Sequence, residues 1–170
     1  GLSEKKAQQL WKLIEPFASY GFNKAHAASY GKVAYQTAYM KANFPAIYMA
    51  SVLTADSGDV EKIAEIVHEC VRMGIEVLAP NINESFGGFT VVNDEKDPKK
   101  QNIRFGLYTI KNFGEGIGDA IINERKKGPF VSITDFLDRI RDRNLNKKSL
   151  EALIKCGAMD QFGERGQLLG

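Results

Sequence analysis

The stretch that decides the fold is "IKNFGEGIGDAIINER", residues 110–125. It places Gly114 and Gly116 two residues apart and Ala120 four residues later, with apolar residues at Ile110, Phe113, Ile117 and Ile121. Because glycine adopts a positive φ without a steric penalty, we expect both glycines to form a tight turn. The small Ala120 allows close packing of flanking helices. The stretch therefore predicts one helix, a tight turn, and a second helix over Gly118–Lys126.

This pattern resembles a helix-hairpin-helix motif. At the start of its second helix, backbone N–H groups point outward and the helix dipole favours an anion. The glycines let a phosphate approach the backbone with no Cβ in the way. Contacts of this kind position a duplex but read no base sequence. The residues predicted to bind DNA are Lys111, Gly114, Glu115, Gly116, Ile117, Gly118, Arg125, Lys126 and Lys127.

Two alternatives stay open for this stretch. The glycines can form only a tight turn between helices, without binding an anion. Glu115 also stands where many such hairpins carry an apolar residue. Because a carboxylate repels phosphate, either Glu115 points away from the DNA or the hairpin binds DNA weakly.

Positive charge gathers around the motif. Residues 96–155 hold 14 Lys and Arg against 8 Asp and Glu, a net charge of +6, which leaves 9 against 13 elsewhere. Such asymmetry indicates that the second half faces a polyanion. Two further helices, expected at Ile133–Arg141 and Lys147–Cys156, allow a second, degenerate hairpin. Their cations either line a groove or form a solvated face (Arg139, Arg141, Arg143, Lys147 and Lys148).

Toward the amino terminus the pattern is helical. Ser3 is expected to cap a first helix with Leu10, Ile14 and Phe17 on one face, which Pro16 kinks or ends. Asn23 is expected to cap a second helix through about Ala42. Pro45 begins a third helix, and "SGDVEKIAEIVHECVRMG", residues 57–74, predicts a fourth. Its predicted cap is Asp59 or Ser57, and its predicted end is Gly74.

Between the two helical regions, apolar and polar residues alternate with the two-residue period of β-strands. A short strand is expected in residues 75–79, before Pro80, and "FTVV" (89–92) with "NIRF" (102–105) predicts a β-hairpin. We therefore predict a mainly α fold in which a helical segment, residues 1–73, is followed by a β-hairpin and a helix-hairpin-helix module, residues 74–170. Cys70 and Cys156 are expected to be free thiols.

The run "YGFNKAHAASY", residues 20–30, combines aromatic, amine and imidazole groups at a helix start. Free N–H groups there, with Lys24 and His26, would suit a triphosphate. Tyr20 and Phe22 would stack on a base. The alternative is a capped helix with a solvent-facing lysine and a histidine whose hydrogen bonds are satisfied within the protein.

Residues 17–53, "FASYGFNKAHAASYGKVAYQTAYMKANFPAIYMASVL", resemble the fingers of bacterial replicative DNA polymerase III alpha subunits, the C-family polymerases. Residues 103–130 and "LNKKSLEALIKCGAMD", residues 145–160, resemble the helix-hairpin-helix segment that follows the fingers in that family. The resemblance covers essentially the whole chain, which is therefore expected to be a fragment. It implies that the parent is a DNA-directed DNA polymerase, a nucleotidyltransferase.

The resemblance also implies roles for residues. Lys24 and His26 would contact the phosphates of the incoming nucleotide, Tyr20 would pack near the nascent base pair, and Asn23 and Tyr30 would support that surface. The fragment would hold no catalytic or metal-binding residue, because the carboxylates that bind Mg²⁺ in the parent belong to its palm. The acidic run "NDEKD", residues 93–97, is interpreted as a solvated loop.

The expected partners are primer-template duplex DNA and an incoming deoxynucleoside triphosphate. Other parts of the parent would bind the sliding clamp and other replisome subunits. No membrane contact is expected, and the location would be cytoplasmic.

Two other functions remain open at this stage. One is a non-enzymatic helix-hairpin-helix module of a repair or recombination protein, with residues 1–73 as a scaffold. The other is a protein-docking surface formed by Tyr39, Phe44 and Tyr48.

Overall fold

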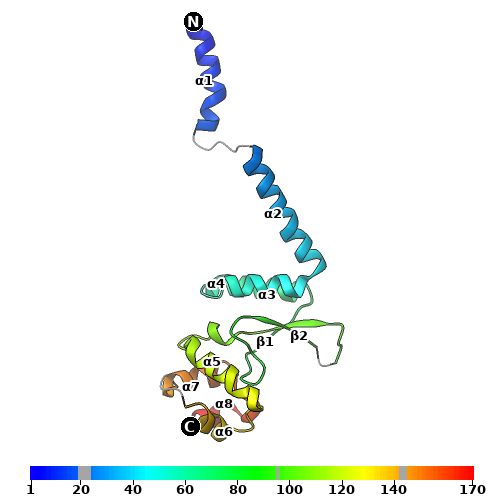
Figure 1. Cartoon of the computed structure of the whole chain (residues 1–170), viewed down its shortest axis with the longest axis vertical. Coiled ribbons are helices and arrows are strands. Elements are labelled where there is room, and N and C mark those ends of the chain that lie inside the picture. Colours follow the sequence, from blue (N-terminus) through cyan, green and yellow to red (C-terminus); the bar gives the residue numbers. More distant parts are fainter. Residues whose placement is uncertain (19–23, 95, 142–144) are drawn as a thin grey trace. The chain divides into compact units, whose positions relative to one another are not determined.

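The computed structural model describes residues 1–18, 24–94, 96–141 and 145–170, excluding the side chains of residues 17 and 18. The chain divides into two compact units, Gly1–Ala42 and Asn43–Gly170. Figure 1 labels the α-helices of both units and strands β1 and β2, and colours the chain from its N-terminus to its C-terminus.

The first unit consists of helices. Helix α1 (Glu4–Ala18) begins directly after Ser3, as predicted. Of the two effects predicted for Pro16, it does not end the helix, because α1 includes Pro16 and continues to Ala18. A proline this close to the end removes few helical hydrogen bonds. Helix α2 (Lys24–Asn43) has the predicted extent, and its predicted cap Asn23 lies outside the described residues.

The apolar side chains of the first unit are exposed. Helix α2 has no buried residue. The stripe predicted for α1 is also exposed at Leu10 and Ile14, while the side chain of Phe17 lies outside the described residues. Exposed large side chains in the unit include Trp11, Leu13, Tyr30, Val33, Tyr35 and Tyr39. The described side chains of the two helices therefore do not form a hydrophobic core of their own.

The second unit opens with two helices whose ends follow the sequence signals. Helix α3 (Pro45–Ala55) has Pro45 as its first residue, as predicted. Helix α4 (Val60–Arg72) is capped by Asp59, whose carboxylate accepts from the N–H groups of Glu61 (3.1 Å) and Lys62 (3.2 Å). This decides between the two caps predicted for α4. Gly74, with φ +76°, follows its C-terminal end.

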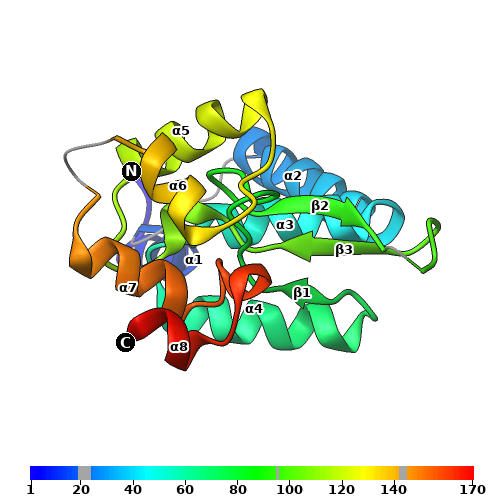
Figure 2. The same ribbon diagram turned by 90° about the horizontal axis from the view of Figure 1, so that it is seen from below.

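Three short strands form one sheet, in the order β1-β3-β2. Strands β2 (Thr90–Asn93) and β3 (Gln101–Arg104) form the predicted antiparallel hairpin. Strand β1 (Val77–Leu78) pairs with β3 in parallel, with Val77 opposite Ile103. Figure 2 shows β3 between its two neighbours.

Helices α3 and α4 pack on this sheet. Their shared core contains Leu53 from α3, Cys70 from α4 and Ile103 from β3, together with Ala46, Met49, Ala50, Ile63, Ile75 and Phe89. The boundary predicted near Gly74 therefore falls inside one compact unit, because helices before it and strands after it bury the same apolar surface. The prediction that residues 1–73 and residues 74–170 have separate functions stays a prediction.

The remaining chain forms short helices around a second core. Helix α5 (Glu115–Glu124) begins three residues earlier than predicted, and continues as the 3₁₀ turn η2 (Arg125–Lys127). Then come α6 (Ile133–Arg139), α7 (Lys147–Lys155), the 3₁₀ turn η3 (Asp160–Phe162) and α8 (Arg165–Leu169). Their core residues are Ile82, Leu107, Ile110, Phe113, Ile117, Ile121, Phe130, Phe136, Ile140, Leu153, Ile154, Ala158 and Met159.

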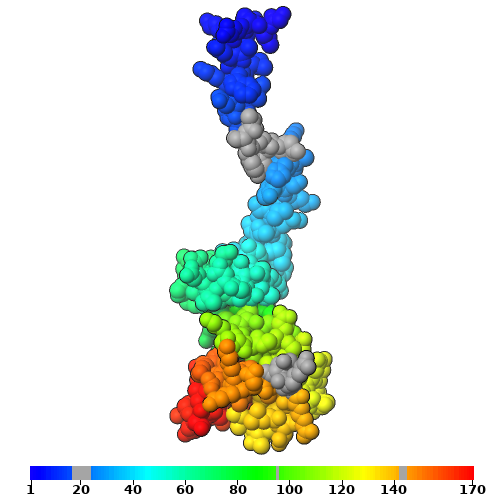
Figure 3. Space-filling model, turned by 90° about the vertical axis from the view of Figure 1, so that its left-hand side faces the viewer, coloured from blue at the N-terminus to red at the C-terminus, as the bar shows by residue number. Residues whose placement is uncertain are grey.

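The predicted start and stop of α7 are confirmed. Asn146 accepts from the N–H of Ser149 at 3.1 Å, and the Ser149 hydroxyl accepts from the Asn146 N–H at 2.9 Å, which completes a capping box. Gly157, with φ +87°, follows the helix. In the space-filling view, α3 and α4 are cyan, and the C-terminal helices of the unit run from yellow to red (Figure 3).

The mainly α fold predicted from the sequence is confirmed, with the small sheet as its only described β structure. No helix in the described part of the chain is long and apolar enough to cross a membrane.

Candidate nucleic-acid interface

The turn before α5 differs from the predicted one. Its first arm is a single 3₁₀ turn, η1 (Leu107–Thr109), where a helix was expected. The positive φ is at Asn112 (+64°), whereas Gly114 has φ −83° and Gly116 lies within α5. The prediction that these two glycines supply positive φ was therefore wrong. Asparagine can take this role because its short polar side chain tolerates the left-handed region.

The start of α5 is open. Gly114 is the N-cap and offers no side-chain hydrogen bond to the helix. Its carbonyl accepts from the N–H groups of Ile117 (3.1 Å) and Gly118 (3.3 Å). The N–H groups of Glu115 and Gly116 are thus the ones that a helix start leaves without an intrahelical acceptor. A Cβ added to Gly114 or Gly116 would meet no atom within 4 Å, so an outside group can approach the backbone closely at both positions.

The close-packed position of the hairpin is Gly118. A Cβ there would lie 2.8 Å from Cε1 of Tyr108, so only glycine fits without movement of the ring. Tyr108 also donates its hydroxyl to Asp119, and this hydrogen bond, with burial, raises the pKa of Tyr108. Ala120, to which the sequence assigned this packing role, is half-buried.

Two of the predicted DNA-binding residues face the core. Ile117 is 2% exposed and packs in the second core, and Gly118 is buried. Glu115 is exposed in the first turn of α5, next to the free N–H groups. A carboxylate in the first turn stabilises a helix through the dipole, which gives Glu115 a structural reason for its position.

The basic residues of the hairpin fall into two classes. Lys111, Lys126 and Lys127 are exposed; Lys126 Nζ contacts Asn123 Oδ1, and Lys127 Nζ contacts Glu124 Oε2, both at 2.8 Å. Arg125 is different, because its Nη1 donates to the backbone carbonyls of Ile82 (3.1 Å) and Ser85 (2.6 Å). Burial lowers the pKa of Arg125. Arg125 therefore anchors the loop between β1 and β2 rather than pointing freely toward solvent.

Only part of the predicted nucleotide site lies among the described residues. Tyr20 and Asn23 lie outside them. Lys24 is exposed at the first position of α2, so its amine stands at a helix start, as the sequence indicated. Two residues on, the half-buried ring of His26 contacts Tyr30, one turn further along α2, with 4.4 Å between ring centroids. Tyr30 itself is 63% exposed.

The family model described as "Helix-hairpin-helix motif" matches residues 74–168, more than half of the chain. The chain belongs to the helix-hairpin-helix family. We call residues 74–168 the helix-hairpin-helix module.

DNA polymerase III alpha subunits match nearly the whole chain. It is 45% identical over 170 residues to the DNA polymerase III subunit alpha of Thermus aquaticus, and 45% identical to that of Deinococcus radiodurans. The Mycobacterium tuberculosis subunit is 43% identical over 164 residues. These alignments cover 96–99% of this chain but only 12–13% of each relative. The resemblance predicted from the sequence is confirmed, and the chain corresponds to about an eighth of these relatives' length.

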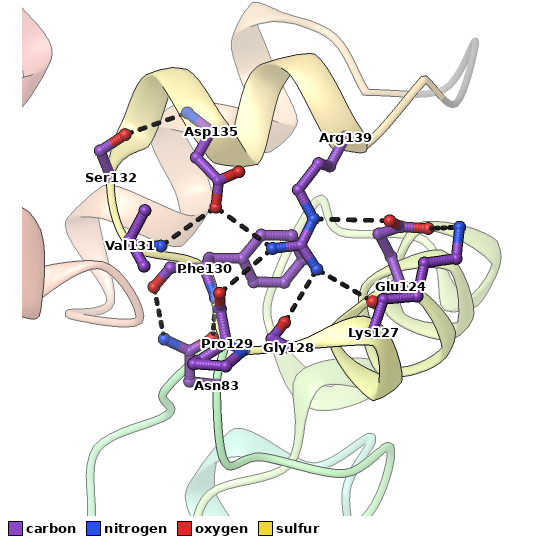
Figure 4. Close-up of polar contacts among 10 residues, drawn as sticks. All are labelled: Asn83, Glu124, Lys127, Gly128, Pro129, Phe130, Val131, Ser132, Asp135 and Arg139. Carbon is purple, nitrogen blue, oxygen red and sulfur yellow. Dashed lines mark hydrogen bonds and ion pairs between the residues drawn. The ribbon is translucent and has the colours of Figure 1, made fainter.

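Within the helix-hairpin-helix module, Arg139 is a structural hub that the sequence did not reveal. Its guanidinium donates to the carbonyls of Glu124 (3.0 Å), Gly128 (2.8 Å) and Pro129 (3.1 Å). It also pairs with the carboxylates of Glu124 and Asp135 and lies over the Phe130 ring at 4.4 Å (Figure 4). The two roles considered for Arg139, groove lining and a solvated face, are therefore both wrong. Arg143 lies outside the described residues.

Within the acidic run, the side chain of Asp94 is engaged in the β2–β3 turn of the module. The Asp94 carboxylate accepts from the N–H of Lys96 (2.9 Å), the N–H of Asp97 (3.1 Å) and the amide of Asn102 (2.9 Å). Among the described residues, no group of three or more His, Cys, Asp or Glu side chains is placed to hold a metal ion. Cys70 and Cys156 are not in a disulfide among the described residues, and burial raises the pKa of Cys156.

Proposed function

We propose that this chain is a DNA-binding segment of a DNA-directed DNA polymerase. Its helix-hairpin-helix module would hold duplex DNA by the backbone, independently of sequence. One observation carries the proposal: the open, glycine-lined start of α5 within a module whose family and relatives are those of a replicative polymerase subunit.

The chemistry of the proposed contact follows from the helix start. The N–H groups of Glu115 and Gly116 would donate to a phosphate oxygen, and the helix dipole would favour its negative charge. Lys111, Lys126 and Lys127 would add salt-dependent attraction. Arg125, Ile117 and Gly118 would support this surface from inside rather than touch the DNA, because their side chains or Cβ positions are used in packing.

The start of α2 is proposed to contact the incoming deoxynucleoside triphosphate. Lys24 would bind a phosphate as a point charge, and His26 would donate to a neighbouring phosphate oxygen. Tyr30 would hold the His26 ring in place, since the two rings are already in contact. The roles of Tyr20 and Asn23 stay predictions.

The catalytic step is proposed to lie elsewhere in the parent. There, carboxylates would hold Mg²⁺ ions that activate the primer hydroxyl and stabilise the leaving pyrophosphate. Binding of the sliding clamp and other replisome subunits would also lie outside this segment. The cytoplasmic location stays a prediction.

The test of the hairpin uses two matched glycine variants of the 170-residue chain. Gly116→Val places a branched side chain where the phosphate would approach, and should weaken binding of blunt duplex DNA about tenfold, the loss of one to two hydrogen bonds to an anion. Gly166→Val is the control, because Gly166 is also the second residue of a helix and also has open space around its Cβ. Fluorescence anisotropy at fixed salt measures both affinities.

The fold of both variants should be intact, since valine has a better helix propensity than glycine. Equal affinities of the two variants for duplex DNA would refute contact through the α5 start. A strong preference among duplexes of different sequence would refute backbone recognition.

A further inference from the structure

Phe86 is an exposed aromatic ring on a fixed segment of backbone. It is 52% exposed. Its own carbonyl accepts from the N–H of Leu107 at 2.8 Å, and the Gly87 carbonyl accepts from the N–H of Tyr108 at 3.0 Å. On the other side, the Ser85 hydroxyl donates to the Phe105 carbonyl at 2.8 Å. The backbone therefore presents this ring to solvent from a rigid position.

One face of the ring is already covered by a cation. The Arg125 guanidinium lies 4.8 Å from the centroid of the Phe86 ring. The guanidinium cannot swing away easily, because Ile82 and Ser85 hold it through their carbonyls. A cation over a π face is attracted to the ring quadrupole, so Arg125 backs one face of the ring and the pair forms a positively charged platform.

The platform borders a hollow of about 440 Å³. It is lined by Asn83, Phe86, Ile122, Arg125, Lys126 and Pro129, which include two cations and no carboxylate. Glu84, whose charge acts on Arg125, is itself paired with Arg104. The hollow therefore suits a ligand that is flat and apolar at one end and anionic at the other.

We propose that this hollow binds an unpaired nucleobase, stacked on Phe86, while Lys126 contacts the adjoining phosphate. The proposal rests on the duplex-binding function proposed above. Charge complementarity favours a nucleotide unit, and every base has a π face that an aromatic ring can stack on. The hollow and the open helix start lie at opposite ends of α5, which at 1.5 Å per residue are about 15 Å apart. That distance is about four base-pair steps. Because duplex would be held at one end of α5 and an unpaired base at the other, the bound DNA would have a junction of duplex and single strand there.

The test compares two DNA ligands with the 170-residue chain, a blunt duplex and the same duplex with a single-stranded overhang. The wild-type chain should bind the overhang DNA more tightly. Phe86→Ala should weaken binding of the overhang DNA about tenfold and leave the affinity for the blunt duplex unchanged. Phe86→Trp should restore binding, while Phe86→Leu, which is apolar without a π face, should not.

Phe44→Ala is the matched control, because Phe44 is a phenylalanine of the same unit with similar exposure, 46%, away from the hollow. It should change neither affinity. A direct readout on the wild-type chain is quenching of 2-aminopurine placed in the overhang, which reports stacking even if Phe86→Ala fails to fold.

Several results would overturn the inference. Equal losses of blunt and overhang binding in Phe86→Ala would give the ring a purely structural role. Wild-type binding of the blunt duplex without any gain from the overhang, or without quenching, would refute the stacking site while leaving the proposed function intact. Binding of neither DNA would refute both. If an acidic, aromatic peptide bound in the hollow and was not displaced by the overhang DNA, and if the overhang did not increase DNA affinity, the occupant would be a protein partner instead.

Discussion

The Asp94 carboxylate holds the β2–β3 turn through three hydrogen bonds. The N–H of Lys96 is the first cause of a lowered pKa for Asp94, followed by the Asn102 amide and the N–H of Asp97. Burial acts in the opposite direction, and Lys100, 3.9 Å away, contributes least. Because these donors interact best with the ionised form, they favour the folded hairpin whenever Asp94 is charged.

This arrangement predicts a pH dependence with a definite sign. The folded pKa of Asp94 is below its usual value of 3.8, so its stabilising effect is present above about pH 4 and is lost as the pH falls through the folded value. NMR titration of the side-chain carboxyl should give a midpoint below 3.8. Lys100→Gln should preserve most of the shift, because hydrogen bonds are its main cause. A midpoint at or above the usual value would contradict this account.

At the scale of single residues, the sequence indicated which residues are important more reliably than it indicated the structural role of each one. Gly114 and Gly116 were correctly placed on an open surface in the hairpin, but the positive φ belongs to Asn112. Arg125 was predicted to attract DNA, yet it binds two backbone carbonyls. Carbonyl acceptors belong to every residue, so a sequence pattern cannot indicate which of them a distant arginine will find.

Among elements, those set by local chemistry were predicted well. Asp59 and Asn146 cap their helices, and Pro45 begins one. The side chain and the N–H groups that it satisfies are within three residues of each other, so the sequence contains the whole interaction. The parallel pairing of β1 with β3 joins residues 26 positions apart and was not predicted. Nothing local to either strand specifies that partner.

Arg139 joins three elements, the end of α5, the segment 128–130 and α6. Its side chain is 21% exposed, and removing it would leave the carbonyls of Gly128 and Pro129 without this donor. We expect Arg139→Ala to lower the free energy of unfolding by about 2–4 kcal/mol, as measured by urea denaturation. Arg139→Lys should recover only part of the loss, since an ammonium lacks the planar fork.

The control for Arg139→Ala is Arg141→Ala. Arg141 is exposed two residues later and should change stability by no more than about 0.5 kcal/mol. Equal changes in the free energy of unfolding of the two alanine variants would mean that Arg139 does not hold the three elements together.

At the scale of the whole molecule, the two units differ in how they are stabilised. The second unit buries two apolar cores, one around Leu53 and Ile103 and one around Ile121 and Leu153. In the first unit, α2 buries none of its residues. The sequence predicted the helices of both units from the same local signals. It did not predict this difference, because burial depends on which surfaces meet.

The difference predicts unequal protection from hydrogen exchange in the 170-residue chain. An isolated helix of about 20 residues is marginally stable in water, so amides of α2 should exchange with an opening free energy of about 0–1 kcal/mol. Amides of α4 should exchange at least about a hundredfold more slowly, since Ile63 and Cys70 anchor that shorter helix in a core. Exchange followed by NMR resolves both helices in one sample. Equal protection of α2 and α4 would show that α2 is stabilised without burial, and that the proposed nucleotide-contacting helix needs no further surface to remain folded.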